Sequence, residues 1–322
     1  MALAGLLAAA GGPSVGSAMD VYLPIANLSV NGLVIVGLGA LTGLLSGMFG
    51  VGGGFLTTPL LIFYGVPPTV AAASAASQVT GASVSGAFTH ARRGGIDYHI
   101  GAVLVAGGMI GTGLGSLLFR LLESLGQIDT AINVLYVLLL GGIGGLMAHE
   151  SLTTLRAQKS GIPVPARKRR HHPLVASLPL RWRFYRSGLY ISPLAPLLLG
   201  MATGILTMLM GIGGGFILVP AMLYILGMGV NVVVGTSLFQ ILFVTMATTM
   251  MHALTTRAVD IVLAVLLLFG SVTGAQVGAQ FAQKAKPEHL RLILAVIVLL
   301  VALRMALGLG YRPDEIYTVV PL

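Results

Sequence analysis

Hydrophobic runs separated by short polar stretches follow one another through most of this chain. A membrane-spanning helix needs about 20 apolar residues, and fewer where it is broken and shielded by its neighbours. We expect about five such segments in each half of the chain. The first half contains residues 33–48, 55–64, 69–88, 100–122 and 132–147, and the second contains residues 193–210, 216–226, 230–251, 261–281 and 290–309. The pattern predicts an all-α polytopic membrane protein.

A glycine-rich motif occurs once in each half. It reads GVGGGFLTTP at residues 50–59 and GIGGGFILVP at residues 211–220. Polar residues beyond the motif recur with nearly the same offset. These pairs are Ser74 and Thr236, Gln78 and Gln240, His90 and His252 and, after one inserted residue, Asp97 and Asp260. A spacing kept through polar positions indicates an internal duplication into two homologous halves of about five helices.

Composition supports the membrane assignment. The chain is 56% hydrophobic and only 8% charged, whereas soluble domains carry roughly a quarter charged residues. Its 45 glycines suit helices that pack closely in lipid. Because the chain has no cysteine, disulfides, thiolate metal sites and a cysteine nucleophile are excluded. We expect no cofactor and no metal.

The stretch between the halves, residues 150–190, contains nine lysines and arginines. Basic loops of membrane proteins are usually topology determinants that face the cytoplasm, which we favour over a nucleic-acid site. Counting five spans in each direction places both termini outside and the remaining basic clusters inside. Those clusters are Arg92 and Arg93 in the first half and Lys284, Lys286 and Arg291 in the second.

Five spans is an odd number, so the two halves enter the membrane from opposite sides and form an inverted repeat. If residues 55–64 and 216–226 were instead re-entrant, each half would cross four times and the repeat would be parallel. Residues 1–30 lack a basic n-region and are expected to form a weakly ordered extension. The predicted organisation is an extension (1–30), a first repeat (31–149), a basic cytoplasmic linker (150–190), a second repeat (191–310) and a tail (311–322).

The glycine motifs are the strongest candidates for ligand binding. Three consecutive glycines do not easily continue a helix, so a new helix should start at Phe55 or Phe216 with free backbone N–H groups. Such a helix N-terminus attracts anions. The alternative is that these glycines only permit close packing or a sharp turn. Two copies across a symmetry axis favour a shared site, with broken helices at Gly52, Gly53 and Gly54 and at Gly213, Gly214 and Gly215.

Hydroxyl and amide side chains follow each motif. Ser74 and Gln78 lie on one helical face, and so do Thr236 and Gln240, with Ser237 adjacent. Serine and threonine in membrane helices often only bond back to the preceding turn, and the glutamines have cross-helix bonding as a structural alternative. No charged residue lies near the middle of any segment. An anion would therefore be held weakly, by partial charges.

His90 and His252 are the titratable pair of the repeat. They lie near the ends of their segments, so they are either interfacial residues that bond a loop or a proton-responsive gate. Asp97 and Asp260 are expected to cap the next helices. The methionine-rich patch at residues 246–251 is expected to pack in the core.

These motifs resemble those of the TauE/SafE sulfite exporter family of membrane permeases. The resemblance lies in the duplicated G-x-G-G-G-F followed by proline, the Gly235 to Ser237 triplet and the basic central loop, and it extends over about residues 33–309. It implies export of a small sulfur-containing or organic anion, such as sulfite, sulfoacetate or a related sulfonate. It also implies substrate contacts at the glycine motifs and at the adjacent polar residues. The first half reads Ala73, Ser74, Ala75 in place of the triplet, so asymmetric substrate contacts are expected in the two halves.

The sequence leaves other classes open. An anion channel, or an importer of another small anion, would use the same site. An intramembrane enzyme would need a nucleophile with a base or grouped metal ligands, and neither HExxH nor GxSxG occurs, so we expect no enzyme. The expected partners are a small anion and the lipid bilayer, without nucleic acid, and a homodimer is an open alternative to a monomer. The expected location is the bacterial cytoplasmic membrane.

Overall fold

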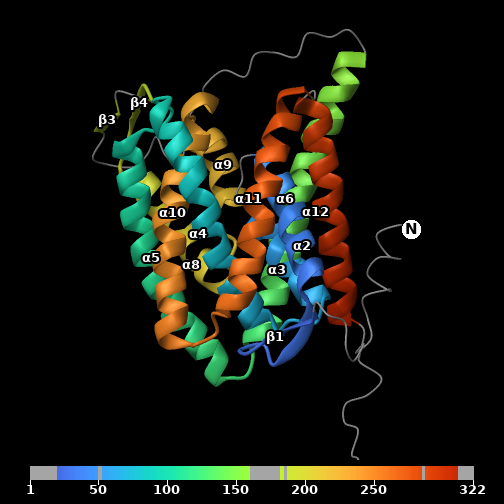
Figure 1. Ribbon diagram of the computed structural model, residues 1–322. Coiled ribbons are helices and arrows are strands. Elements are labelled where there is room, and N and C mark those ends of the chain that lie inside the picture. Colours follow the sequence, from blue (N-terminus) through green and yellow to red (C-terminus); the bar gives the residue numbers. More distant parts are fainter. Residues whose placement is uncertain (1–19, 50–52, 160–181, 185–186, 285–286, 311–322) are drawn as a thin grey trace, which may run out of the picture.

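The computed structural model describes residues 20–49, 53–159, 182–184, 187–284 and 287–310. Within these ranges the chain forms ten helices and four short strands (Figure 1). The helices of the first half are α2 (Gly32–Phe49), α3 (Gly54–Phe63), α4 (Pro68–Arg92), α5 (Tyr98–Ser124) and α6 (Ile128–Lys159). Those of the second half are α8 (Leu194–Met210), α9 (Gly215–Tyr224), α10 (Val230–Thr255), α11 (Ile261–Lys284) and α12 (Pro287–Gly310). All ten predicted segments coincide with helices.

The helices fall into groups by length and hydropathy. Five are long and apolar enough to cross a membrane, namely those in α5, α6, α10, α11 and α12. Four shorter apolar helices are α2, α3, α8 and α9. Helix α4 is long but rich in alanine, serine and glycine, and its residues 71–76 are all buried. Because other helices cover α4, it does not need an apolar surface of its own.

Helices of the two halves are interleaved. The most extensive contacts are those of α2 with α11, α5 with α8, α6 with α12 and α4 with α10. Each of these pairs joins one helix from the first half to one from the second. The two sequence repeats are therefore not separate bodies. Helices α4 and α10 lie against each other, with α11 beside α4 and α5 beside α10 (Figure 1).

Two of these pairs, α2–α11 and α5–α8, are packed through glycines, and we call them the glycine-packed pairs. A Cβ added to Gly107 on α5 would lie 2.1 Å from the Leu197 carbonyl oxygen, and one on Gly111 would lie 2.1 Å from that of Met201. On α11, a Cβ at Gly274 would lie 2.1 Å from the Ala40 carbonyl oxygen. Only glycine permits helix backbones to approach this closely.

A β-hairpin precedes one helix of each glycine-packed pair, namely α2 in the first pair and α8 in the second. Strand β1 (Asp20–Leu23) pairs with β2 (Leu28–Asn31), and β3 (Trp182–Phe184) pairs with β4 (Leu189–Ile191), both antiparallel. The hairpins lie at opposite ends of the helical body (Figure 1). They occur in the stretches that we expected to form an extension and a linker. Strands of three or four residues are too short to produce a recognisable hydrophobic alternation.

Large apolar side chains cover the outside of the helical body. Leu138, Leu146 and Phe269 are among the many that are exposed, as expected for a surface that faces lipid. The methionine patch on α10 belongs to this surface, since Met246 is 51% exposed and Met250 58%. The expectation that this patch packs in the core is therefore wrong for these two residues. Sequence alone could not separate core from lipid contact, because both environments favour apolar side chains.

The glycine packing predicts opposite effects for two neighbouring substitutions on α5. Gly111→Ala should lower the free energy of unfolding by about 1–3 kcal/mol, because its methyl group would collide with the α8 backbone. Gly113→Ala should raise it by about 0.5–1 kcal/mol, because nothing lies within 4 Å of the added carbon and alanine favours the helix. Thermal unfolding of both purified variants in detergent tests this, and equal shifts would contradict the packing argument.

The positions of the hairpins predict that they are accessible from opposite sides of the membrane. The chain has no cysteine of its own, so single cysteines can be introduced at exposed hairpin positions, as Ser29→Cys and Tyr190→Cys. In spheroplasts, a membrane-impermeant maleimide should label only one of the two variants, and inverted vesicles should show the reverse. Our topology assigns the external label to Ser29→Cys. Labelling of both from the same side would contradict an inverted arrangement.

Candidate functional site

The two glycine motifs meet in the interior. A Cβ on Gly54 would lie 2.8 Å from the Gly211 carbonyl oxygen and 2.9 Å from that of Ile212. Phe55 and Phe216, which follow the motifs at equivalent positions, stack with ring centroids 4.6 Å apart and an interplanar angle of 8°. Both rings are buried. The structure therefore brings together the two motifs that the sequence singled out, although Gly52 lies outside the described residues.

The second motif forms a sharp break between α8 and α9. Gly211, Gly213 and Gly214 have φ values of 71°, 75° and 75°, a left-handed conformation that side chains other than glycine adopt at a cost. Helix α9 then begins at Gly215, with Gly214 as its N-cap. In the first motif Gly53 caps α3 with an ordinary helical φ of −67°. The motifs are thus equivalent in sequence but differ in backbone conformation.

The break exposes backbone donors inside the protein. The Gly214 carbonyl accepts bonds from the N–H groups of Ile217 and Leu218. Among the described residues, neither the Gly213 nor the Gly215 N–H donates a backbone hydrogen bond outside the helices. Both glycines are buried. Unpaired N–H groups at the start of a buried helix favour a negatively charged or strongly hydrogen-bond-accepting ligand.

Gln240 lies beside this helix start. Its side chain is fully buried, its Nε2 lies 3.5 Å from the Thr203 hydroxyl, and its Oε1 has no partner. Thr203 in turn flanks the second motif, since a Cβ on Gly214 would lie 3.1 Å from the Thr203 Cβ. Thr207 is next to Gly214 on the same side. The amide is therefore connected to the glycine motif through α8.

Gln78 is the repeat equivalent of Gln240 and is also buried. Neither its Nε2 nor its Oε1 has a hydrogen-bond partner within the described part of the chain. A buried polar group left without a partner costs about 1–3 kcal/mol. The Gln240 amide is incompletely paired at the equivalent place, and because most buried polar groups are paired, both amides stay candidates for contact with a polar ligand.

Ser74 and Thr236 are hydrogen-bonded to the starts of neighbouring helices. The Asp260 N–H donates to the Ser74 hydroxyl at 3.1 Å, and the Asp97 N–H donates to the Thr236 hydroxyl at 3.0 Å. These equivalent bonds join α4 to the start of α11 and α10 to the start of α5. Ser237 donates to the Val234 carbonyl within its own helix. These three hydroxyls therefore take part in contacts within or between helices, and their expected substrate contacts stay a prediction.

Asp97 and Asp260 hold the helix starts and the hairpins together. As predicted, they act as caps, because Asp97 accepts from the N–H groups of His99 and Ile100, and Asp260 accepts from that of Leu263. Their second carboxylate oxygens reach the hairpins, where Asp97 accepts from the Ser187 N–H at 3.1 Å and Asp260 from the Ile25 N–H at 3.0 Å. Each glycine-packed pair is thus tied to one hairpin.

The two candidate histidines differ in environment. His252 is fully buried, and its Nε2 donates to the Met208 carbonyl at 2.9 Å while its ring packs edge-on against Phe119. His90 is only partly buried near the end of α4. The Met208 carbonyl lies at the end of α8, so His252 supports the helix that leads into the second motif. These contacts favour the structural alternative for His252.

Sequence reasoning missed residues that flank the motifs. Gly53 lies next to the Thr42 carbonyl and the Ser46 Cβ, and Gly214 lies next to the side chains of Thr203 and Thr207. These pairs have the same offset as the glycine motifs, which was the signal that could have found them. Tyr136 was also missed, and its hydroxyl donates to the Met210 carbonyl at 2.6 Å. It carries no repeat signal that could have identified it.

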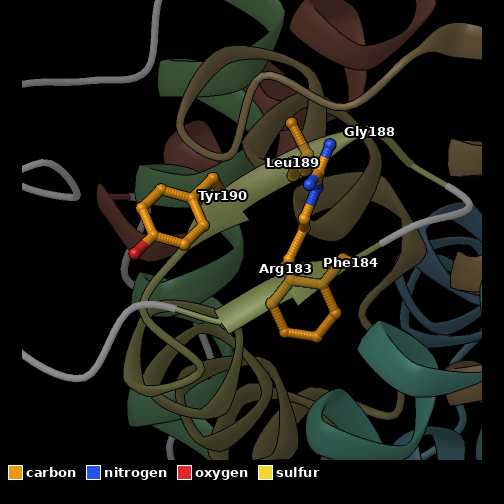
Figure 2. Close-up of a pocket in the computed structure, with 5 residues that line it drawn as sticks. All are labelled: Arg183, Phe184, Gly188, Leu189 and Tyr190. Atoms are coloured by element: carbon orange, nitrogen blue, oxygen red, sulfur yellow. The ribbon is translucent and has the colours of Figure 1, made fainter.

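A pocket is present at the β3–β4 hairpin (Figure 2). It is lined by Arg183, Phe184, Gly188, Leu189 and Tyr190. None of the candidate site residues lines it. We therefore assign this pocket no part in the candidate site.

Comparisons with known proteins identify the family. The family model described as sulfite exporter TauE/SafE matches residues 35–305. A probable membrane transporter protein of Xylella fastidiosa strain Temecula1 is 29% identical over 275 residues, covering 84% of this chain and 93% of that protein. The probable membrane transporter protein YjnA of Bacillus subtilis is 27% identical over 271 residues, covering 84% and 98%. No solved structure matches this chain.

The backbone difference between the motifs predicts unequal effects of the same substitution. Gly214→Ala should lower the free energy of unfolding by about 1–2 kcal/mol more than Gly53→Ala, because only Gly214 has a left-handed conformation. Gly37→Ala on α2, where nothing lies within 4 Å of the added carbon, is the matched control. Thermal stability measured by fluorescence-detection size-exclusion chromatography compares the three variants. Equal losses at Gly53 and Gly214 would show that the two motifs have the same conformation.

Proposed function

Because the chain belongs to the sulfite exporter TauE/SafE family, we propose that it is a secondary transporter that exports a small sulfur-containing or organic anion. Sulfite, sulfoacetate and related sulfonates are the proposed substrates. The observation that carries this proposal is the buried start of α9, where unpaired glycine N–H groups lie near the incompletely paired Gln240 amide. These groups offer hydrogen-bond donors to an oxyanion.

The electrostatics of the site suit release as well as binding. No lysine or arginine is buried among the described residues. An anion in the interior would be held by N–H dipoles and amides in place of a salt bridge, so it would leave easily. With the cell interior negative, each exported negative charge gains about 2.3 kcal/mol per 100 mV, or roughly a fifty-fold concentration ratio. Export of a monoanion therefore requires no coupled ion.

We propose that the two halves form an inverted repeat. Equivalent contacts support this arrangement, namely Ser74 with Asp260 and Thr236 with Asp97, together with the Phe55–Phe216 stack. The hairpins at opposite ends of the body support it further (Figure 1). In the proposed orientation, in the bacterial cytoplasmic membrane, the linker is cytoplasmic and both termini are external. A homodimer stays a prediction.

Alternating access is the proposed mechanism. Since the most extensive contacts join the two halves, rocking of one sequence half against the other would break the largest interfaces. We propose that each glycine-packed pair moves as a unit against the central helices α4 and α10. Asp97 at the start of α5 is bonded to Thr236 of α10, and Asp260 at the start of α11 is bonded to Ser74 of α4. These bonds would then lie at the ends of the moving interfaces and would keep each glycine-packed pair connected to α4 or α10.

An anion channel is the second candidate, because the same donors could line an open path. Proton coupling is a further alternative, and His90 and His252 are its candidates. The proton-coupled form has weaker support at His252, whose Nε2 is engaged with the Met208 carbonyl. Saturating flux with counterflow would favour the carrier, and fast non-saturating conductance would favour the channel.

Sulfite efflux from proteoliposomes tests the proposed function, with protein-free liposomes as the control. We expect saturable efflux that accelerates when the lumen is made negative and does not depend on a pH gradient. Dependence on the pH gradient would establish proton coupling instead. If sulfite does not move, sulfoacetate and other sulfonates are tested in the same preparation, and a failure of all of them would contradict anion export.

A further inference from the structure

We propose that the transporter has two anion subsites, one toward each membrane face, instead of one shared site at the midplane. This inference rests on the proposed function. The first subsite is formed by Gln78 with Thr42, Ser46 and Gly53. The second is formed by Gln240 with Thr203, Thr207 and Gly214.

The second subsite is defined by direct contacts. Gln240 is held between α5 and α8, because its Nε2 lies 3.1 Å from where a Cβ on Gly108 would be and 3.5 Å from the Thr203 hydroxyl. That hydroxyl donates to the Gly200 carbonyl, so it can only accept from the amide. Thr203 thereby orients the Gln240 side chain beside the start of α9. The long amide–hydroxyl distance leaves Nε2 available to a better acceptor, such as an anion oxygen.

The first subsite is placed by its neighbours on α4. Ser74, Gln78 and Gly81 lie on one face of that helix. Ser74 bonds Asp260 at the start of α11, and a Cβ on Gly81 would touch Leu268 of α11. Gln78, between them, therefore faces the α2–α11 pair. This pair includes Thr42 and Ser46, which lie next to Gly53.

The subsites lie toward opposite faces of the membrane. Gln78 is one helical turn from Ser74, which contacts Asp260 and through it the β1–β2 hairpin. Gln240 is likewise one turn from Thr236, which contacts Asp97 and the β3–β4 hairpin. The hairpins occupy opposite ends of the body (Figure 1). Each glutamine is thus one helical turn from the residue that is connected, through an aspartate, to the hairpin on its own side.

The repeat indicates that both subsites take the same ligand. Thr42, Ser46, Gly53 and Gln78 each have a counterpart of equal or similar chemistry. Both offer an incompletely paired amide that is at least 99% buried, without a cationic side chain. The ligand class is a small oxyanion with several acceptor oxygens, consistent with sulfite or a sulfonate. Transport then consists of transfer between two similar subsites, and neither needs to be exposed to both faces.

Variants of the two glutamines test the proposal with sulfite as the probe. Half-saturation for sulfite exchange is measured in right-side-out and in inside-out vesicles. Gln78→Leu should raise it about tenfold on the β1–β2 face and less than twofold on the other, and Gln240→Leu should do the reverse. Gln276→Leu is the matched control, because Gln276 is an exposed glutamine of α11. Equal increases on both faces would establish a single shared site and overturn the proposal.

Binding stoichiometry gives a second measurement that does not require transport. Equilibrium dialysis of purified protein with radiolabelled sulfite should find two ions per chain in the wild type and one in either variant. One ion in the wild type would overturn the proposal while leaving anion export intact, whereas absent sulfite and sulfonate exchange would count against the proposed function itself.

Both leucine variants should also unfold at a higher temperature than the wild type, because each removes a buried amide that is incompletely paired. A lower unfolding temperature would assign the amides a structural role and contradict the proposal.

Discussion

Backbone contact between helices is the constraint on which the rest of this structure depends. In the α5–α8 and α2–α11 pairs, carbonyl oxygens occupy the space that a side chain would need at Gly107, Gly111 and Gly274. In lipid there is little hydrophobic force to drive helices together, so close van der Waals packing has to supply the association. The contacts also join helices from different halves, which makes the halves interdependent and fixes where the central helices α4 and α10 lie.

The hydrogen bonding of buried polar side chains differs between the residues that connect the helices and the residues of the candidate site. Asp97 and Asp260 each accept several bonds that join a helix start to a hairpin. The carbonyls at the end of α8 are occupied by His252 and Tyr136. Gln78 and Gln240 differ from these residues, because the buried Gln78 amide has no partner and the buried Gln240 amide has none for its Oε1 among the described residues. Because most buried polar groups of a folded protein are paired, these two incompletely paired amides are the groups that we propose contact the anion.

Symmetry in sequence does not extend to every detail of structure. The stacked phenylalanines and the equivalent bonds of Ser74 and Thr236 follow the repeat. The backbone does not, since Gly53 is helical and Gly214 left-handed. A transporter that alternates between two related states is expected to show such differences in any single state, because the two halves exchange conformations when access changes sides.

The sequence by itself determined the number and approximate positions of the helices, the duplication, the caps at Asp97 and Asp260, and the meeting of the glycine motifs. These features depend on local hydrophobicity, helix-breaking residues and constant spacing, all of which can be read along the chain. Only the tertiary structure decided that the Ser74 and Thr236 hydroxyls accept bonds from Asp260 and Asp97, that Met246 and Met250 face outward, and that Thr42 and Thr203 flank the motifs. The physical reason is that a hydroxyl or a methionine has no fixed role of its own. Its partner comes from a helix distant in sequence, and that helix is placed by glycine contacts between the two halves.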